Sequence, residues 1–314
     1  MILDRVAGAT EGVDTAGPID ESVRVRPTPA LRSAAAWYSG YRQVGVAPAV
    51  HRGLPSPFLT LIFTIDDPMT IIRHVDPAQP GGDFPSLVGG LHATPAFIRH
   101  DGRQAGIQVA LDPLAARGLL GLPAGELAGL DVTADAVLGR RCSTLLDQLQ
   151  YAATWPERFA ALDVFLQAAA RPCGEPAPEV AQAWRGLRRT RGMISVADLA
   201  AEVGWSERHL SEIMRRETGL APKAAARVIR FDHVRRLLTA EATRYGACPN
   251  LADLAVQAGY YDQAHLAREF GALAGCPPTV WLAEQTAQYG EFRNIQAEPD
   301  RAAAHSEKQE TQAA

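Results

Sequence analysis

The sequence predicts an α+β protein of two domains, an N-terminal small β-barrel domain with helices and a C-terminal domain made only of helices. The length of 314 residues is enough for two domains, since a domain takes roughly 100–200 residues. Residues 28–112 contain short runs rich in β-branched and aromatic residues, which are typical of strands. Residues 179–287 contain no such run, and part of them occurs twice, which indicates a duplicated helical unit.

Each predicted strand is a short apolar run closed by turn residues. Residues 58–65 are the clearest case, because a proline precedes the run and Asp-Asp-Pro follows it. Further strands are expected at residues 70–75, 87–88, 97–99 and 106–111. Short strands at this spacing predict a sandwich or a barrel. Leucine and phenylalanine then recur at helical spacing, which predicts helices at residues 143–152 and 156–169.

Changes in composition mark the ends of the domains. Residues 1–27 are mixed and poor in aromatics, which predicts a mobile arm before a domain at 28–170. Residues 171–178 carry three prolines and cannot continue a helix, so they are expected to be a linker. The second domain is expected at 179–289. Residues 290–314 are polar and rich in Ala, Glu and Gln, which predicts a disordered tail.

Charge and hydropathy indicate which partners and which cellular location to expect for the chain. The net charge is −4, but residues 179–289 hold 14 Arg and Lys against 12 Asp and Glu. The helical part is thus the basic part, although so small an excess is weak evidence for binding to nucleic acid. No stretch approaches the roughly 18 apolar residues of a membrane span. The first residues lack the pattern of a signal peptide, so we expect a cytoplasmic protein with no membrane partner.

Metal and catalytic motifs are not recognisable in the sequence. The chain has four isolated cysteines: Cys142, Cys173, Cys248 and Cys276. Their spacing fits neither a zinc site nor a disulfide framework. The strand-rich half also has histidines, at His51, His74, His92 and His100, but no His-x-His pair. No nucleophile triad or phosphate loop occurs, so we expect no catalytic residue, no metal, no cofactor and no enzyme activity.

An internal repeat is the sharpest feature of the sequence. Residues 198–205, Asp-Leu-Ala-Ala-Glu-Val-Gly-Trp, align with residues 253–260, Asp-Leu-Ala-Val-Gln-Ala-Gly-Tyr. Each copy predicts a short helix, a turn at a glycine and a second helix. The predicted helix pairs are 196–203 with 207–218, and 251–258 with 263–274. This is the helix-turn-helix plan, in which the second helix enters the major groove of DNA.

The second helix of each copy, called here the reading helix, has one polar face. In the first copy Ser206 is a good N-cap, and leucine, isoleucine and methionine face inward. The residues expected to contact DNA from this helix are Ser206, Glu207, Arg208, Ser211, Glu212 and Arg215. The aromatic residues beside the turns and in the last helix, Trp205, Tyr260 and Trp281, are expected to anchor the core instead.

A single helix is expected to join the two copies. Residues 222–240 carry an apolar stripe and begin with a proline, which suits the first turn of a helix. At 1.5 Å per residue this helix is about 28 Å long. Consecutive major-groove faces lie about 34 Å apart. The two reading helices therefore suit adjacent turns on one face of DNA.

Residues 179–287 resemble the DNA-binding domain of the AraC/XylS family of transcription regulators. The stretch 255–278, Ala-x3-Gly-Tyr-Tyr-Asp-Gln-Ala-His-Leu-Ala-Arg-Glu-Phe-x4-Gly-x-Pro-Pro, is similar to the signature of the family's second unit. The resemblance implies seven helices with two helix-turn-helix units. It also places DNA contacts in the second unit at Gln263, Ala264, His265 and Arg268. Tyr261, Leu266 and Gly271 depart from the family pattern, so the second unit is expected to hold DNA less firmly.

Residues 28–170 more loosely resemble the cupin-like effector domains of such regulators. The strands, the segment 106–113 and the helical stretches 119–130 and 142–169 carry this resemblance. It implies a domain that binds a small molecule or self-associates.

These observations predict a sequence-specific transcription regulator, either an activator or a repressor. The expected partners are double-stranded DNA and a small-molecule effector, with RNA polymerase and a second copy of the chain as further candidates. One alternative is a cupin-type enzyme with a regulatory helical domain. A DNA-repair alkyl acceptor would need a zinc-bound cysteine cluster, which the sequence lacks. A protein-interaction module with one degenerate repeat is the third alternative.

Overall fold

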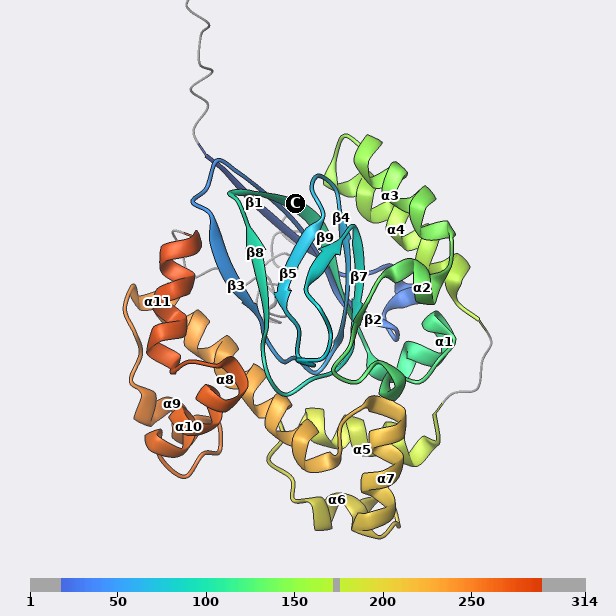
Figure 1. The fold of residues 1–314 in the computed structure, drawn as a ribbon. Helices are drawn as coiled ribbons and strands as arrows, with labels where there is room; N and C mark the ends of the chain where they lie inside the picture. Colours follow the sequence, from blue (N-terminus) through green and yellow to red (C-terminus); the bar gives the residue numbers. More distant parts are fainter. Residues whose placement is uncertain (1–17, 172–175, 290–314) are drawn as a thin grey trace, which may run out of the picture.

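The computed structural model describes residues 18–171 and 176–289. Two antiparallel sheets and flanking helices form the N-terminal domain, and a purely helical domain lies beside and below them in Figure 1. The predicted tail 290–314, Cys173 and most of the predicted arm 1–27 lie outside the described residues. In the described part, no helix combines the length and the apolar character needed to cross a membrane.

The strands belong to two separate sheets. The larger sheet has the spatial order β1 (Ile19–Val25), β2 (Ala35–Val44), β9 (Arg103–Leu111), β4 (Leu59–Thr64), β7 (Ser86–Gly89) and β10 (Asp131–Val132). The smaller sheet has the order β3 (Ala49–Gly53), β8 (Ala96–His100), β5 (Met69–Arg73) and β6 (Gly82–Phe84). No strand pairing joins the two sheets within the described residues, so the β-rich N-terminal domain that the sequence predicted consists of two sheets and does not close into a barrel.

The sequence patterns predicted only part of this sheet. The expected strands at 58–65, 70–75, 87–88, 97–99 and 106–111 are confirmed as β4, β5, β7, β8 and β9. The expected arm is wrong for Ile19–Val25, because this segment pairs with β2 along its whole length. Strands β1, β2 and β3 mix polar and charged residues with apolar ones, so their sequence pattern is weak. Pairing with neighbouring strands of the sheets makes them strands.

Two helices cover one face of the larger sheet. They are α3 (Arg141–Tyr151) and α4 (Trp155–Ala169), and they confirm the helices expected at 143–152 and 156–169. Helix α4 begins with a complete capping box made by Thr154 and Glu157. The Tyr38 hydroxyl on β2 donates to Asp163 of α4 over 2.9 Å. A Cβ at Gly40 would lie 2.4 Å from the Trp155 ring, so β2 needs glycine there.

The stretch expected as one helix at 119–130 is broken. It contains the end of α1 (Ala116–Leu120) and the 3-10 turn η3 (Ala124–Leu127), and α2 (Ala134–Leu138) follows. Gly121 has φ 80°, a left-handed conformation that ends α1. Pro123 then prevents the helix from resuming at once.

The C-terminal domain has the expected seven helices within the described residues. They are α5 (Pro178–Arg189), α6 (Val196–Glu202), α7 (Glu207–Thr218), α8 (Pro222–Tyr245), α9 (Leu251–Gln257), α10 (Gln263–Ala274) and α11 (Pro278–Tyr289). Helix α8 ends at Tyr245, five residues after the expected end at 240, and Gly246 is its C-cap. Its 24 residues make it about 36 Å long at 1.5 Å per residue. Its core side includes Val228 and Phe231, and Phe231 lies 4.9 Å from the ring of Phe270 on α10.

The N-terminal domain packs directly on the first helix-turn-helix unit. Arg117 donates two hydrogen bonds, of 2.9 and 3.0 Å, to the buried carboxylate of Glu217 on α7. The η3 turn lies against the C-terminal end of α7, where backbone meets backbone at Gly125. The N-terminal domain therefore supports the C-terminal end of α7.

Replacing Gly125 with alanine is expected to weaken this contact between the domains. A Cβ at Gly125 would lie 2.1 Å from the carbonyl oxygen of Arg216, and backbone cannot move aside as a flexible side chain can. Overpacking of this kind costs about 1–3 kcal/mol. Urea unfolding should show the loss, and amide exchange should increase at 207–218. Gly118→Ala is the control, because its Cβ would make an ordinary 3.7 Å contact; equal behaviour of the two variants would contradict the prediction.

Candidate nucleic-acid interface

The first unit consists of α6, a glycine turn and α7. Ser195 caps α6, and Gly204 makes the turn with φ 71°. Ser206 caps α7 by accepting a hydrogen bond of 3.2 Å from the backbone of His209, as its position predicted. Leu210 and Met214 are fully buried, which fixes the face that α7 turns to the core.

Most of the residues of α7 predicted to contact DNA lie on its outer face, and Ser211 and Ser206 are the two exceptions. Glu207, Arg208, Glu212 and Arg215 are exposed, and none of them has an ion-pair partner among the described residues. Ser211 is half-buried. The Ser206 hydroxyl accepts the capping hydrogen bond, so its first role is to begin the helix. Charged side chains without partners are available to hydrogen-bond to base edges or phosphates.

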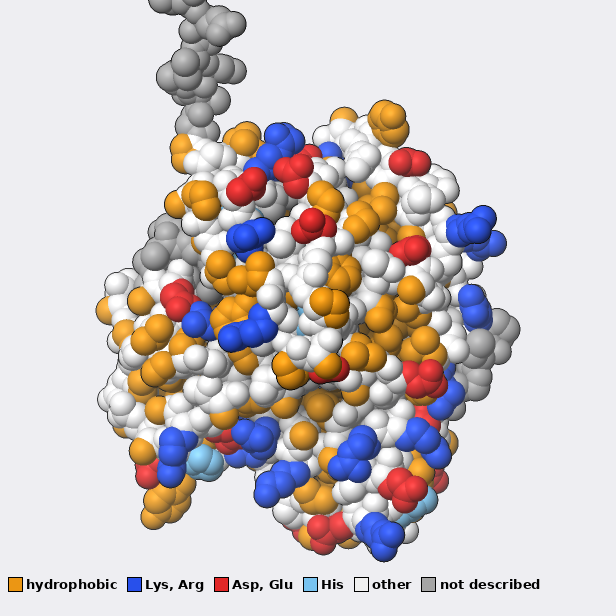
Figure 2. Space-filling model, viewed as in Figure 1, with side chains coloured by type: hydrophobic (Ala, Val, Ile, Leu, Met, Phe, Trp, Pro, Cys, Tyr) orange, Lys and Arg blue, Asp and Glu red, His pale blue; other side chains and the backbone are white. Residues whose placement is uncertain are grey.

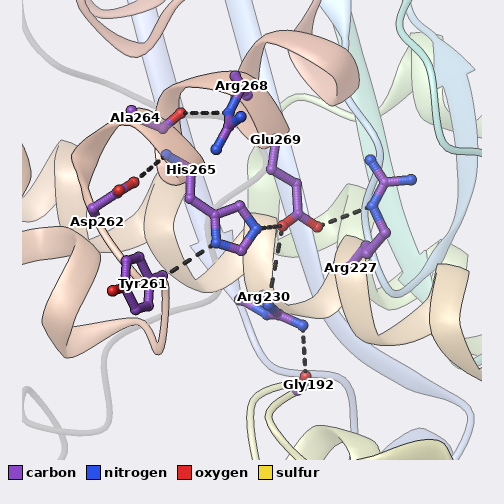
Figure 3. Close-up of polar contacts among 9 residues, drawn as sticks. All are labelled: Gly192, Arg227, Arg230, Tyr261, Asp262, Ala264, His265, Arg268 and Glu269. Carbon is purple, nitrogen blue, oxygen red and sulfur yellow. Dashed lines mark hydrogen bonds and ion pairs between the residues drawn. The ribbon is translucent and has the colours of Figure 1, made fainter.

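The second unit repeats this construction with other residues. Asn250 caps α9, Gly259 makes the turn with φ 74°, and Asp262 caps α10. Gln263, Ala264 and Arg268 are exposed on the outer face of α10. Arg268 lies along its own helix, because its Nε donates to the carbonyl oxygen of Ala264 over 3.3 Å (Figure 3).

His265 differs from the other predicted contact residues of α10. Its Nδ1 accepts from the backbone of Tyr261 over 3.4 Å, and its Nε2 lies 3.5 Å from a carboxylate oxygen of Glu269 (Figure 3). The i,i+4 spacing brings these two side chains together on one face of the helix. The ring edge also packs on Tyr260 at 5.2 Å, so part of this side chain is committed to the structure of the unit.

Glu269 is a structural residue that the sequence analysis missed. This buried carboxylate accepts a hydrogen bond of 3.0 Å from Arg227 and lies 4.0 Å from Arg230, both on α8 (Figure 3). Arg230 also donates to the carbonyl oxygen of Gly192 in the α5–α6 turn over 3.1 Å. This network ties the second reading helix to the connecting helix and to the first unit. A charged residue on the inward face of a predicted helix was the only signal for it.

Both reading helices lie along the same edge of the molecule. In Figure 1, α7 and α10 occupy the lower right and lower left, away from the sheets, with α8 running between the two units. Lys and Arg side chains are spread along this lower edge in Figure 2. Arg235 of α8 cannot contact DNA from this edge, because its side chain is fully buried, 2.5 Å from Asp232. Tyr260 beside the second turn and Trp281 in α11 were expected to anchor the core, and this is confirmed, because the two residues are only 5% and 1% exposed to solvent.

A cavity of about 100 Å³ lies between the two sheets. Its apolar wall includes Ile62 of the larger sheet and Ile71 of the smaller one. Its polar lining includes His51, whose pKa is lowered to about 4 by burial and by the neighbouring His100, so its ring is neutral at pH 7. Trp281 of α11 completes the lining, so the helical domain forms part of the cavity wall.

Acid is expected to weaken the contact between the α5–α6 turn and α8. Arg191 Nη1 lies 3.3 Å from His233 Nε2, which is an acceptor only when the ring is neutral. Burial, Arg191 and Arg236 lower the pKa of His233 to about 4 from 6.5. Between pH 6.5 and 4 the unfolded chain therefore binds a proton that the folded protein does not, and the free energy of unfolding falls as the pH falls.

Urea unfolding of His233→Gln across this pH range measures the effect. Glutamine keeps a neutral polar side chain at every pH, so the variant should lose less stability on acidification than the parent protein. The other buried histidines, His51 and His100, still contribute in both proteins, and the difference between the two curves isolates His233. Identical pH dependence of the two proteins would contradict the assignment.

Comparison with known proteins gives a family match within the helical domain. Residues 199–284 match a protein family described as a helix-turn-helix domain. No curated protein matches the sequence. Among solved structures, ToxT from Vibrio cholerae bound to an unsaturated fatty acid has a TM-score of 0.47 and 7% identity, over 88% of this chain and 98% of ToxT.

Two other solved structures are more distant. The C-terminal domain of AraT, a response regulator from Geobacillus stearothermophilus, has a TM-score of 0.31 and 18% identity, over 42% of this chain and 99% of that one. The AraC-like transcriptional activator CuxR has a TM-score of 0.26 and 13% identity, over 70% and 87%.

The helical part of the chain therefore carries a helix-turn-helix domain, which occurs here as two units beside a β-rich domain.

Proposed function

We propose that the chain regulates transcription by laying α7 and α10 into consecutive major grooves on one face of its operator. The observation that carries this proposal is the pair of polar helix faces along one edge, joined by a single helix of 24 residues. At about 36 Å, that helix is comparable to the 34 Å or so between adjacent major-groove faces. Arg208 and Gln263 stand at the starts of the two reading helices, where helix-turn-helix proteins contact base edges.

The N-terminal domain is proposed to sense a small molecule in the cavity between its sheets. Filling this cavity would act on both units, because Trp281 belongs to the wall and the η3 turn packs on α7. A ligand that fits one arrangement of the two domains better than another shifts the population of the DNA-binding form. A second copy of the chain and RNA polymerase remain the further proposed partners.

Selection of bound sequences from random double-stranded DNA tests the proposal. The expected result is a site with two conserved patches centred about one helical turn apart. Gel shifts with the selected DNA should then show affinity that falls steeply with salt. A single patch, or binding with no sequence preference, would contradict the use of both reading helices.

The alternative of a cupin-type enzyme with a regulatory helical domain has less support. The matched domain is a helix-turn-helix domain, a type whose second helix enters the major groove of DNA. Within the described ranges, no group of three or more His, Cys, Asp or Glu side chains is arranged to hold a metal ion. Metal analysis of the purified protein is a direct check on this alternative.

A further inference from the structure

We propose that Tyr261 contacts the DNA backbone, with its hydroxyl donating a hydrogen bond to a phosphate oxygen beside the groove that α10 enters. Tyr261 is not among the contact residues expected from the sequence. The inference rests on the proposed function, because it adds a contact to the second unit and states the chemistry of that contact.

The turn of the second unit is one residue longer than the turn of the first. In the first unit, Ser206 caps α7 two positions after Gly204. In the second unit, Asp262 caps α10 three positions after Gly259. The second turn therefore contains an additional residue between its glycine and its cap.

The ring contacts of the two turns identify Tyr261 as the additional residue. The Trp205 ring lies 4.7 Å from the ring of His209, which is the third residue after the cap of α7. The Tyr260 ring lies 5.2 Å from the ring of His265, which is the third residue after the cap of α10. Tyr260 thus takes the place of Trp205, and Tyr261 has no counterpart in the first unit.

The side chain of Tyr261 faces solvent, whereas its backbone is held in place. The residue is 91% exposed, although Tyr260 beside it is buried. Its backbone N–H donates to Nδ1 of His265 over 3.4 Å. In Figure 3 its ring lies away from Glu269 and from the two arginines of α8. A tyrosine ring has only two side-chain torsions, so fixing it against DNA from a backbone already held costs little conformational entropy.

The outer face of α10 offers few other free donors to DNA. The Nε of Arg268 already donates to the carbonyl oxygen of Ala264, which itself has no polar side-chain atom. His265 is held between the preceding turn and a carboxylate of its own helix. Gln263 has no side-chain partner among the described residues, so it remains available. Because α7 exposes four charged residues in the first unit, a further donor beside α10 supplies what this helix lacks.

The position of Tyr261 favours a phosphate over a base as its partner. Residues in the first turn of a reading helix, such as Gln263, contact base edges in the groove. Tyr261 precedes the cap and lies outside the helix, so its side chain is better placed for the phosphates that border the groove. Tyrosine hydroxyls are among the groups that bind DNA phosphates. The nearby Asp262 carboxylate is turned to the helix, because it accepts a hydrogen bond of 2.6 Å from the backbone of His265.

Tyr261→Phe in the full chain tests the proposal, because this change removes the hydroxyl and keeps the ring. Gel shifts with the selected DNA should show binding at least about tenfold weaker than that of the parent, since the lost hydrogen bond is made to a charged group. Tyr261→Ala should weaken binding by a similar factor. Tyr151→Phe is the matched control, because this tyrosine of α3 is 89% exposed in the N-terminal domain, and it should bind DNA as the parent does.

Two further readouts separate a phosphate contact from a base contact. The selected sequence should be the same for Tyr261→Phe and the parent, because a phosphate carries no sequence information. Ethylation of one phosphate beside the second patch should weaken binding by the parent and leave binding by Tyr261→Phe unchanged. The dependence on salt should stay the same, since a neutral hydroxyl releases no counterion.

Three results would overturn the proposal. They are parent-like binding by Tyr261→Phe, an equal loss in Tyr151→Phe, and a changed base preference at one position of the selected site. A selection that returns no site overturns this proposal together with the proposed function. Two selected patches with parent-like binding by Tyr261→Phe overturn this proposal alone.

Discussion

The double variant Arg208→Ala, Arg268→Ala is expected to lose most of its sequence-specific DNA binding. Each arginine lies exposed on a different reading helix, and an arginine that contacts guanine typically contributes about 1–3 kcal/mol. The two positions belong to separate units without a shared partner, so their losses should add to about 2–6 kcal/mol. Gel shifts with the selected operator measure the change in dissociation constant.

The single variants make the prediction more specific. Arg208→Ala is expected to cost more than Arg268→Ala, because Arg268 already donates to the carbonyl oxygen of Ala264. Each single variant should relax the base preference at one position of the selected site. Arg141→Ala removes an equal charge from an exposed position in the N-terminal domain and serves as the control. If the control weakens binding as much as Arg208→Ala, the loss reflects net charge and not base contact.

The largest loss of stability is expected for Asp232→Ala. Asp232 on α8 is buried and contacts two arginines, Arg235 at 2.5 Å and Arg236 at 3.2 Å. Arg235 is fully buried and cannot become neutral by losing its proton, since the guanidinium stays charged in proteins. Removing one partner of a buried ion pair typically costs about 3–5 kcal/mol.

Urea unfolding of the helical domain measures this loss through the transition midpoint. Asp253→Ala is the matched control, because that aspartate is exposed in the first turn of α9 and should cost less than about 1 kcal/mol. A loss of similar size in the two variants would contradict the view that Asp232 neutralises a buried charge. Because α8 joins the two units, Asp232→Ala should also weaken DNA binding at temperatures where the domain partly unfolds.

Local sequence was enough to predict the reading helices. The bounds Glu207–Thr218 and Gln263–Ala274 agree with the expected 207–218 and 263–274, because each helix carries its own start and stop. Ser206 and Asp262 begin the two helices as side-chain caps, and Gly219 and Gly275 end them with left-handed φ angles of 90° and 74°. Such signals act within a few residues and do not need the rest of the fold.

Strand pairing could not be predicted in the same way. Strand β2 became a strand because β1 and β9 hydrogen-bond to its two edges, and β9 is distant from β2 in the sequence. The strands form two sheets because the edge strands of one sheet do not pair with those of the other. The sequence pattern of short strands does not show which edges pair, so it was compatible with a barrel as well.

The sequence by itself determined the repeated helical unit, its polar faces and the class of DNA-binding domain, because these depend on periodicity and capping over short stretches. Only the tertiary structure decided which charges are available. Arg235 is buried beside Asp232, and His265 lies next to Glu269. Arg52 of the N-terminal domain forms an ion pair with Glu284 of the C-terminal domain. Whether a charged residue faces solvent, a partner or a cavity depends on segments far away in the chain, and that information is absent from its local sequence.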